Sequence, residues 1–326
     1  MVMPRFHPDL ALARWIPPTN IPARLVPLLQ RVSGRLPVAP ADVEIRQVDV
    51  PGPDGAPPVP LRVYRSRLAP AVTPALLWIH GGGLIMGSPA QDERHCLELA
   101  RTLGIVVASV DYRLPPAHRA PAAAEDCYAA LTWLHRRRAE LGIDAARLAV
   151  GGASAGGGLA AAVAQMALDR GQVPLAFQLL VYPMLDDRTG TRPEHDTPGI
   201  RVWTPHNNRL GWRSYLGVEP GAETVPDHAV PARREDLHGL PPAWIGVGSL
   251  DLFHDEDVRY AARLRGAGVD CRLEIIGGAF HGFDALFPRA DVTRDFRRSQ
   301  ARALQEALGT PGSVPAEPEE APPPGT

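Results

Sequence analysis

The stretch that most constrains this chain covers residues 148–159 and has the sequence LAVGGASAGGGL. Its first three residues are apolar and predict a buried strand, whereas residues 159–166 predict a helix. Between them, Gly152-x-Ser154-x-Gly156 fits the sharp strand-to-helix turn known as a nucleophile elbow. Glycine is needed because this turn strains the backbone of the serine and leaves no room for neighbouring Cβ atoms. We therefore expect the Ser154 hydroxyl to project beside the N-terminal N–H groups of the helix.

The pentapeptide alone leaves a simple alternative open, a glycine-rich turn with a solvated or helix-capping serine, because the chain has 31 glycines. Competing motifs are weaker. All 34 basic residues are arginine, which excludes a P-loop lysine, a lysine Schiff base, pyridoxal phosphate anchored on lysine and a Ser-Lys dyad. A loose dinucleotide-binding match, Gly156-x-Gly158-x-x-Ala161, begins inside the expected helix instead of at the end of the strand.

Composition narrows the class of protein. A chain of 326 residues with 45% hydrophobic and 21% charged residues suits one large α/β domain with insertions, or two smaller domains. The formal net charge of −2 provides no basic field to recruit nucleic acid or an anionic membrane. No apolar run approaches the roughly 20 residues of a membrane span, and the start lacks the apolar core of a secretory signal. We therefore expect a cytoplasmic protein without a membrane span.

The three cysteines, Cys96, Cys127 and Cys271, are scattered along the chain. Their odd number argues against a disulfide framework, and their spacing is not that of metal ligands. We expect buried thiols and no metal site.

The hydrophobic pattern predicts an α/β fold whose sheet is mostly parallel, doubly wound and antiparallel at its start. Residues 43–50 and 59–64 flank a Pro/Gly turn and predict a hairpin. From residue 75 onward, fully apolar segments alternate with helical ones, which is typical of a parallel sheet covered on both faces. The remaining expected strands are 75–79, 105–110, 148–150, 177–181, 244–247 and 271–276, and the expected helices lie near 90–103, 121–140, 155–170, 255–267 and 290–308.

Three segments do not follow this alternation of strands and helices. Prolines divide residues 1–40 into short pieces, so we expect a wrapping arm that forms part of a cap. Residues 186–230 are too long for an ordinary loop and are expected to be a cap insertion within a catalytic domain of residues 41–308. Residues 309–326 are proline-rich and poor in apolar residues, and are expected to form a disordered tail.

Catalysis by Ser154 requires a base, a group that orients the base, and donors for an oxyanion. Candidates follow the expected strands, where doubly wound sheets place their sites. The run His80-Gly81-Gly82-Gly83 follows strand 75–79 and exposes backbone N–H groups that can approach a substrate carbonyl. Asp251 and His281 each follow a later strand, so serine, acid and histidine occur in the order that such an elbow requires.

Each candidate has a competing interpretation. Asp255, Glu256 and Asp257 are rival carboxylates, but they occupy the first turn of a helix, where negative charge is favoured anyway. Asp251 lies closer to the end of the strand and is preferred, although it also suits a helix N-cap. His281 alone could be structural.

Five motifs, in this order, resemble the α/β-hydrolase superfamily and specifically its hormone-sensitive-lipase-like carboxylesterases of the HGGG type. They are His80–Gly83, Asp111–Pro116, Gly152–Gly157, Asp251 with Asp255-Glu256, and Phe280–Phe283. The resemblance covers residues 40–308 and implies an α/β-hydrolase fold with a small helical cap.

The resemblance also implies a function. It predicts a serine carboxylesterase in which Ser154 is the nucleophile, His281 the general base and acid, and Asp251 the residue that orients His281. The implied oxyanion donors are the N–H groups of Gly82, Gly83 and Ala155, and the implied partner is a small-molecule ester, with no cofactor. We expect Asp111 and Arg113 to brace the junction between sheet and loop.

Two positions depart from the family pattern. Ala153 stands where aspartate or threonine is common before the serine, and Leu252-Phe253 follow Asp251 where Pro-Leu is common. Neither removes a group that performs chemistry. An acyl pocket that favours short to medium chains is expected from Leu84, Ile85, Met86, Trp203 and Phe283, although cap-to-core packing explains the aromatic residues equally well.

Several alternatives stay open. The same three side chains serve an amidase, a deacetylase, or a lactone or carbamate hydrolase. A non-catalytic small-molecule receptor of the same fold usually lacks the nucleophile or the base, and here both are present. The last strand, 271–276, is an expected exposed edge that predicts a homodimer if it pairs with a second copy.

Overall fold

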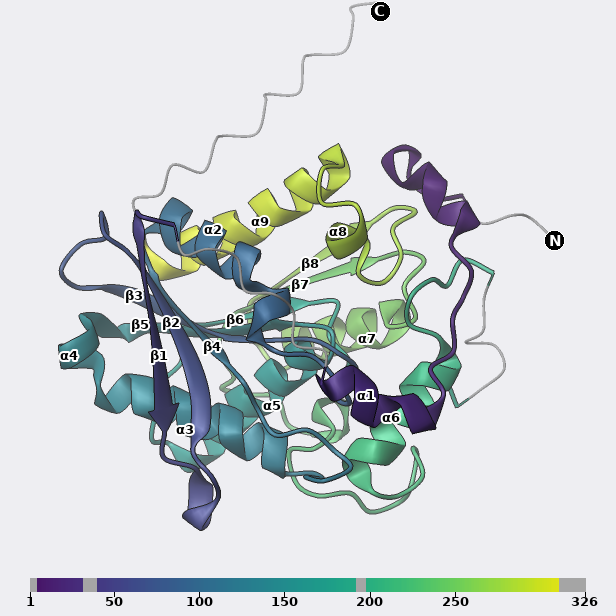
Figure 1. Cartoon of the computed structure of the whole chain (residues 1–326), viewed down its shortest axis with the longest axis horizontal. Helices are drawn as coiled ribbons and strands as arrows, with labels where there is room; N and C mark the ends of the chain where they lie inside the picture. The colour runs from purple at the N-terminus through teal and green to yellow at the C-terminus, as the bar shows by residue number, and fades with distance from the viewer. Residues whose placement is uncertain (1–4, 32–39, 192–197, 311–326) are drawn as a thin grey trace, which may run out of the picture.

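The computed structural model describes residues 5–31, 40–191 and 198–310 (Figure 1). Within these ranges the strands form one eight-stranded sheet in the order β1-β2-β4-β3-β5-β6-β7-β8. Strand β2 runs antiparallel to both of its neighbours, and the pairs from β4 through β8 are parallel. The strands are β1 (Val43–Val50), β2 (Val59–Ser66), β3 (Thr73–Ile79), β4 (Val106–Val110), β5 (Ile143–Ala153), β6 (Phe177–Val181), β7 (Ala243–Gly248) and β8 (Cys271–Ile276). The expected mostly parallel sheet with an antiparallel N-terminal hairpin is confirmed.

Helices cover both faces of this sheet, which is why its central strands are apolar throughout. In β3, Leu76 and Trp78 enter one core while Leu77 and Ile79 enter the other, since successive side chains of a strand point to opposite faces. One face carries α2 (Glu93–Leu103) and α9 (Asp291–Leu308), and the other carries α3 (Ala122–Arg136), α5 (Ala155–Arg170) and α7 (His254–Gly266) (Figure 1).

Two expected boundaries are wrong. The helix predicted at 121–140 is divided at Arg137, whose backbone (φ −91°, ψ 10°) separates α3 from α4 (Arg138–Leu141). Strand β5 begins at Ile143 and not at residue 148. Its first residues, 143–147, include the charged Asp144 and Arg147, so they lack the continuous apolar pattern from which the strand was predicted. The remaining short elements are η3 (Pro53–Gly55), η4 (Pro89–Gln91), η6 (Pro231–Arg233) and α8 (Phe283–Leu286).

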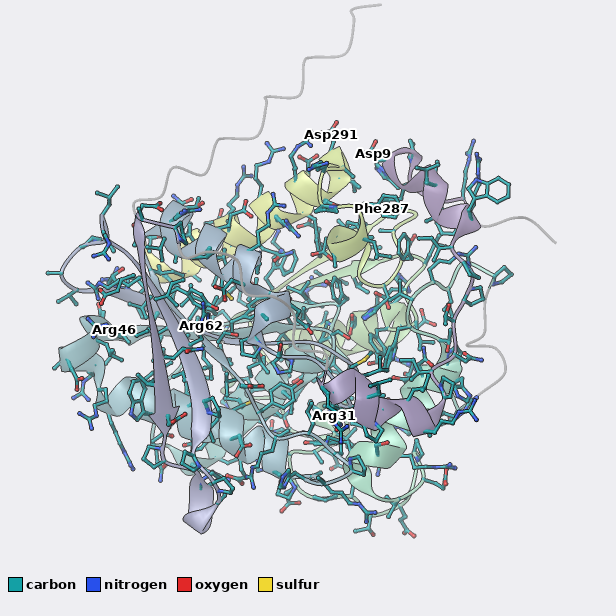
Figure 2. All side chains as sticks on the ribbon, in the orientation of Figure 1. Asp9, Arg31, Arg46, Arg62, Phe287 and Asp291 are labelled. Carbon is teal, nitrogen blue, oxygen red and sulfur yellow. The ribbon has the colours of Figure 1, made fainter. Side chains whose placement is uncertain are left out.

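The N-terminal arm forms short helical pieces, as its prolines predict. These are η1 (Pro8–Trp15), η2 (Ala23–Leu25) and α1 (Val26–Arg31). At one end, the Asp9 carboxylate accepts a hydrogen bond of 3.0 Å from the Val292 N–H at the start of α9, and Figure 2 shows Asp9 beside Asp291. At the other end, the arm lies against α6 (Pro205–Leu216) (Figure 1).

Asn207 joins the arm to α6 through two hydrogen bonds. Its Oδ1 accepts from the Ile21 N–H at 2.7 Å, and its Nδ2 donates to the Thr19 carbonyl at 2.9 Å. The arm and α6, the main element of the segment 186–230, are therefore one connected layer. Residues 192–197 of that segment and residues 311–326 of the expected tail lie outside the described residues.

The thiols of Cys96, Cys127 and Cys271 are buried and free, as expected. Burial raises the pKa of Cys271 to about 11, so this thiol is a poor nucleophile near neutral pH. No helix among the described residues combines the length and the apolar character needed to cross a membrane.

Candidate active site

Ser154 occupies the turn between β5 and α5 in strained backbone geometry. Its φ of 58° and ψ of −121° are unfavourable for a residue with a side chain. The turn is possible because a Cβ atom on Gly156 would overlap the Ile79 carbonyl, and one on Gly152 would overlap Gly156. The Ser154 N–H donates to the Val181 carbonyl at 2.8 Å, which fixes the turn to the end of β6.

Hydrogen bonds join the three side chains that the sequence places far apart. His281 Nε2 lies 2.9 Å from Ser154 Oγ, and His281 Nδ1 lies 2.9 Å from Asp251 Oδ2. A carboxylate only accepts, so Nδ1 carries the ring hydrogen and Nε2 is free to accept the serine proton. The second carboxylate oxygen accepts from the Phe253 N–H at 2.9 Å. Ser154 and His281 are only 7% and 6% exposed. The hydrogen-bonded series Asp251–His281–Ser154 is therefore shielded from bulk water.

The rival carboxylates are directed elsewhere. Asp255 is exposed and contacts His254. Glu256 is buried and accepts from the N–H groups of Leu185 and Asp186, while Asp257 is buried without a hydrogen-bond partner among the described residues. Burial raises the pKa of the Glu256 and Asp257 carboxyls well above their ordinary values. Of these carboxylates and Asp251, only Asp251 contacts His281.

The glycine run after β3 bends back beside Ser154. Gly82 (φ 116°), Gly83 (φ 61°) and Leu84 (φ 66°) all have positive φ, and the Gly82 carbonyl accepts from the N–H groups of Ile85 and Met86. Within the described ranges, the N–H groups of Gly82 and Gly83 donate to no backbone carbonyl. Ala155 is the first residue of α5, so its N–H has no carbonyl one turn earlier in the helix. All three predicted oxyanion donors are thus available to a ligand.

Residues of the segment 186–230 pack closely against this glycine run. A Cβ atom on Gly83 would overlap the Trp203 ring, and a Cβ atom on Gly211 of α6 would overlap the Gly83 carbonyl. The Trp203 Nε1 donates to Asn208 Oδ1 at 3.1 Å, which anchors the indole to α6. Glycine at 83 and 211 is therefore required by close approach.

The predicted acyl-pocket residues divide into two groups. Leu84 and Ile85 are buried, and Met86 is partly buried, in the same hydrophobic cluster as Trp203. Phe283 belongs to the opposite cluster, where its ring packs 5.1 Å from that of Phe296 on α9. Phe283 is fully buried in that cluster, away from Trp203, which does not favour the expected contact with an acyl group.

Two aromatic neighbours of His281 were not predicted from the sequence. The rings of Tyr182 and Phe253 lie edge-on to the imidazole, with centroids 4.9 and 5.0 Å away. The Tyr182 hydroxyl donates to Asp284 Oδ1 at 2.7 Å. Both residues follow strands β6 and β7 closely, and this position at the carboxyl end of the sheet is the signal that would have identified them.

A third missed residue, Gln30 of α1, had no local signal. Its Nε2 donates to the Ile85 carbonyl at 2.9 Å and to the Pro115 carbonyl at 2.6 Å. The arm therefore also holds the segment that follows the glycine run.

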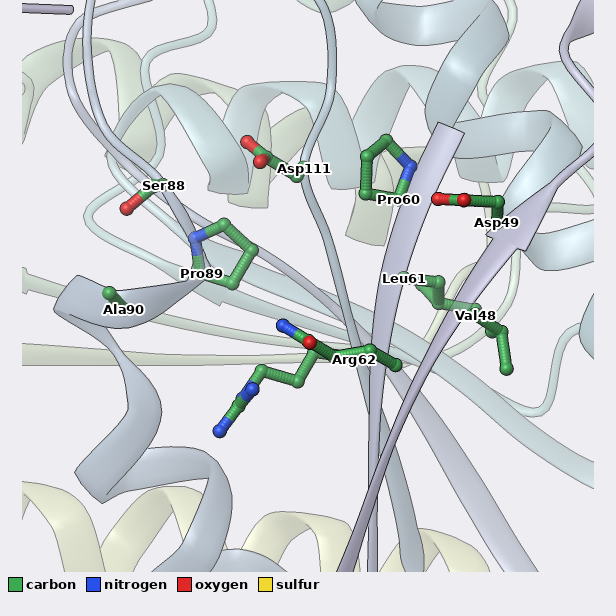
Figure 3. Close-up of a pocket in the computed structure, with 10 residues that line it drawn as sticks. Val48, Asp49, Pro60, Leu61, Arg62, Ser88, Pro89, Ala90 and Asp111 are labelled. Atoms are coloured by element: carbon green, nitrogen blue, oxygen red, sulfur yellow. The ribbon is translucent and has the colours of Figure 1, made fainter. Parts of the chain in front are cut away.

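The motif after β4 has a structural role, in part as expected. Arg113 forms a two-pronged ion pair with the buried Asp126 of α3, at 2.8 and 2.7 Å. Asp111 instead lines a cavity of about 390 Å³ between the β1–β2 hairpin and residues 88–90 (Figure 3). Figure 3 shows Ser88 and Asp111 on one side of this cavity and Asp49 on the other, and none of the hydrogen-bonded series lines it.

Metal ligands do not gather anywhere in residues 5–31, 40–191 and 198–310, where no three His, Cys, Asp or Glu side chains lie close enough to share an ion.

His80, directly before the glycine run, supplies a test of stability against pH. Its ring is fully buried, stacks on Tyr112 at 4.2 Å and makes a 2.8 Å contact from Nδ1 to the Gly81 carbonyl. Burial lowers the pKa of His80 to about 4. Below about pH 6.5 the His80 imidazole binds a proton in the unfolded chain but stays neutral in the folded chain. The free energy of unfolding therefore falls as the pH drops.

We expect this histidine to remove roughly 3 kcal/mol of unfolding free energy between pH 7 and pH 4. His80→Gln should flatten the pH dependence by that amount in urea titrations, whereas replacement of the exposed His118 by glutamine should not. Identical pH profiles for His80→Gln and the unaltered protein would contradict the assignment.

A family described as the alpha/beta hydrolase fold matches residues 76–285. The chain is 36% identical to esterase LipI of Mycobacterium tuberculosis, covering 76% of this chain and 78% of that protein. It is 35% identical to an ethyl acetate hydrolase of Pseudomonas putida, covering 69% of this chain and 71% of that protein.

Among solved structures, a bacterial heroin esterase matches with a TM-score of 0.83 and 37% identity, covering 93% of this chain and 98% of that chain. The chain therefore belongs to the hormone-sensitive-lipase-like branch of the α/β-hydrolase family and is a carboxylesterase-like hydrolase.

Proposed function

We propose that this chain hydrolyses carboxylic esters of short to medium acyl chain length through an acyl-enzyme on Ser154. One observation carries the proposal: the series from Asp251 through His281 to Ser154, with two contacts of 2.9 Å, lies beside the free N–H groups of Gly82 and Gly83. Nucleophile, base, orienting acid and oxyanion donors are the complete set that acyl transfer requires.

The reaction follows from this arrangement. Ser154 Oγ attacks the ester carbonyl carbon while His281 Nε2 takes the serine proton, and Asp251 stabilises the imidazolium that forms. The N–H groups of Gly82, Gly83 and Ala155 hold the oxyanion, and loss of one such donor typically costs about 2.7–4 kcal/mol in the barrier. His281 then protonates the leaving alcohol. In the second half, His281 activates water, which releases the acid and restores Ser154.

Acyl chain length is limited, in this proposal, by the indole of Trp203. The indole lies against Gly83 in the cluster that contains Leu84 and Ile85, so a bound acyl group has little room to extend beyond it. Similarity to an ethyl acetate hydrolase supports the same preference.

A panel of 4-nitrophenyl esters from acetate to palmitate tests the proposal. We expect kcat/KM to peak between acetate and hexanoate and to fall steeply for decanoate and longer chains, because long chains meet Trp203. Trp203→Leu should move the peak to longer chains, whereas Trp133→Leu on α3 should not. An unchanged profile for Trp203→Leu would exclude this residue as the limit on chain length.

The alternative functions have their own readouts. An amidase or deacetylase would turn over acetanilide or other N-acetylated substrates faster than the matching esters. A lactone or carbamate hydrolase would likewise turn over lactones or carbamates faster than those esters. A fluorophosphonate that labels Ser154 once per chain, detected by mass spectrometry, supports the nucleophile. Binding of esters without labelling or turnover would favour a receptor.

We infer two further features of the protein, a cap over the glycine run and a homodimer. The N-terminal arm and α6 form a cap over the glycine run, as the bonds of Asn207 and the overlap at Gly211 support. A homodimer through β8, an edge strand of the described sheet, stays a prediction that light scattering tests.

A further inference from the structure

A second cavity, apart from Ser154, lies between helices α2 and α9 on the other face of the sheet. Its volume is about 670 Å³, and α2 and α9 run side by side there (Figure 1). This volume lies within the range of about 300–1,000 Å³ that is typical of small-molecule sites. None of Ser154, Asp251 and His281 lines it.

The lining of this cavity is strongly basic. Of the described residues around it, five are arginines and one is a carboxylate, Glu98. The arginines are Arg94, Arg289, Arg294, Arg297 and Arg298.

Two of these arginines are held by exposed neighbours on α9, since Arg294 pairs with Asp291 and Arg298 with Asp295. Exposed pairs of this kind contribute little, about 0–1 kcal/mol, and exchange partners readily. Arg94 and Arg289 form no ion pair within the described part of the chain. The cavity therefore carries positive charge that its one lining carboxylate, Glu98, does not balance.

Two buried nitrogen atoms beneath the cavity also lack partners. Arg297 Nε and His95 Nε2 are buried and make no hydrogen bond to any described residue, although both side chains line the cavity. Burial, with a smaller contribution from Arg297, lowers the pKa of His95 to about 3, so the imidazole is neutral. Arg297 is oriented by a 3.1 Å hydrogen bond from its Nη2 to the Asp284 carbonyl.

Unpaired buried donors are rare because each costs about 1–3 kcal/mol. An anion in the cavity would place acceptors near Arg297 Nε, between the arginine side chains and, in the tautomer that carries the ring hydrogen on Nε2, near His95. Two deeper carboxylates lie near Arg297: Asp92 accepts from Trp78 Nε1 at 2.9 Å, and Asp284 accepts from Tyr182. Neither forms an ion pair with Arg94 or Arg289 in the described part of the chain.

We propose that the cavity between α2 and α9 binds a small molecule that carries a diphosphate or longer phosphate group. Guanidinium groups match phosphate oxygens in two-pronged pairs, and Arg94 and Arg289, which form no ion pair within the described residues, are available for them. The site is separate from the ester site, so a ligand there binds without displacing substrate.

Isothermal titration of the full chain with pyrophosphate tests this site. We expect saturable binding that weakens as NaCl rises from 0.05 to 0.3 M, because charge pairing supplies the affinity. The double variant Arg94→Gln/Arg289→Gln should bind at least tenfold more weakly. Arg46→Gln, which removes an exposed arginine of β1 (labelled in Figure 2) that does not line the cavity, should bind as the unaltered protein does.

Three results would overturn the site: no binding of pyrophosphate at millimolar concentration, equal binding by the double variant, or an equal loss in Arg46→Gln. Citrate that binds as tightly as pyrophosphate would contradict the phosphate assignment. The double variant should retain full esterase activity and an unchanged melting temperature, so failure of this site is distinguishable from failure of the proposed hydrolase mechanism.

Discussion

Ser154→Ala should lower kcat for 4-nitrophenyl acetate by about 10⁶-fold, because without the hydroxyl the imidazole has no proton to transfer and no acyl-enzyme forms. His281→Ala should lose a similar factor, and the double variant should lose no more than either single variant, since the two groups act as one unit. Asp251→Asn should lose about 10⁴-fold, because the amide favours the wrong imidazole tautomer. Initial rates measure these losses, and active-site titration of the Ser154→Ala preparation counts any contaminating serine esterase, whose rate is then subtracted.

Ser299→Ala is the matched control for the serine replacement. Ser299 lies on α9, where its hydroxyl bonds Glu274, and it contacts none of the three residues. Its activity should equal that of the unaltered protein. If Ser154→Ala kept more than about one thousandth of kcat, the covalent mechanism would be wrong.

Gly83→Ala should lower kcat and kcat/KM together by about 10²–10³-fold, the cost of displacing one oxyanion donor. The added methyl group would overlap the Trp203 ring, so either the indole or the glycine run must move. Loss in both parameters by the same factor is the signature of an interaction made only in the transition state.

Two variants separate this clash from the cost of a positive φ. Gly171 at the end of α5 has the same φ of 61°, with no atom within 4 Å of a Cβ there, so Gly171→Ala should leave activity unchanged. Trp203→Leu removes the ring atoms that the methyl group would overlap, and adding it to Gly83→Ala should restore activity at least tenfold. A Gly83→Ala enzyme with normal kcat would refute the role of this loop as an oxyanion hole.

Most of the sheet could be predicted because its information is local. Strands such as β3 and β4 are continuous apolar runs, and helices such as α5 and α9 end at glycines in the left-handed conformation. The misplaced start of β5 has the opposite cause: residues 143–147 have no apolar run of their own and are strand because Thr73 pairs with Ile143.

The candidate site was predictable only as far as each residue follows a strand. Ser154, Asp251 and His281 all lie at the carboxyl ends of parallel strands, and parallel strands bring those ends to one edge. Phe283 also follows such a strand, yet its ring belongs to the core beside Phe296. The direction of a side chain after a left-handed glycine is not a property of local sequence.

The amino-acid sequence by itself determined the alternation of strands and helices, the tight elbow at Ser154 and the chain order of the three residues, because these depend on neighbours along the backbone. Tertiary structure decided which carboxylate meets His281, how Trp203 and Gly211 close on Gly83, and that five arginines from α2, α9 and the turn before α9 share one cavity. Those outcomes depend on contacts between residues far apart in the chain, whose geometry exists only after the layers have packed.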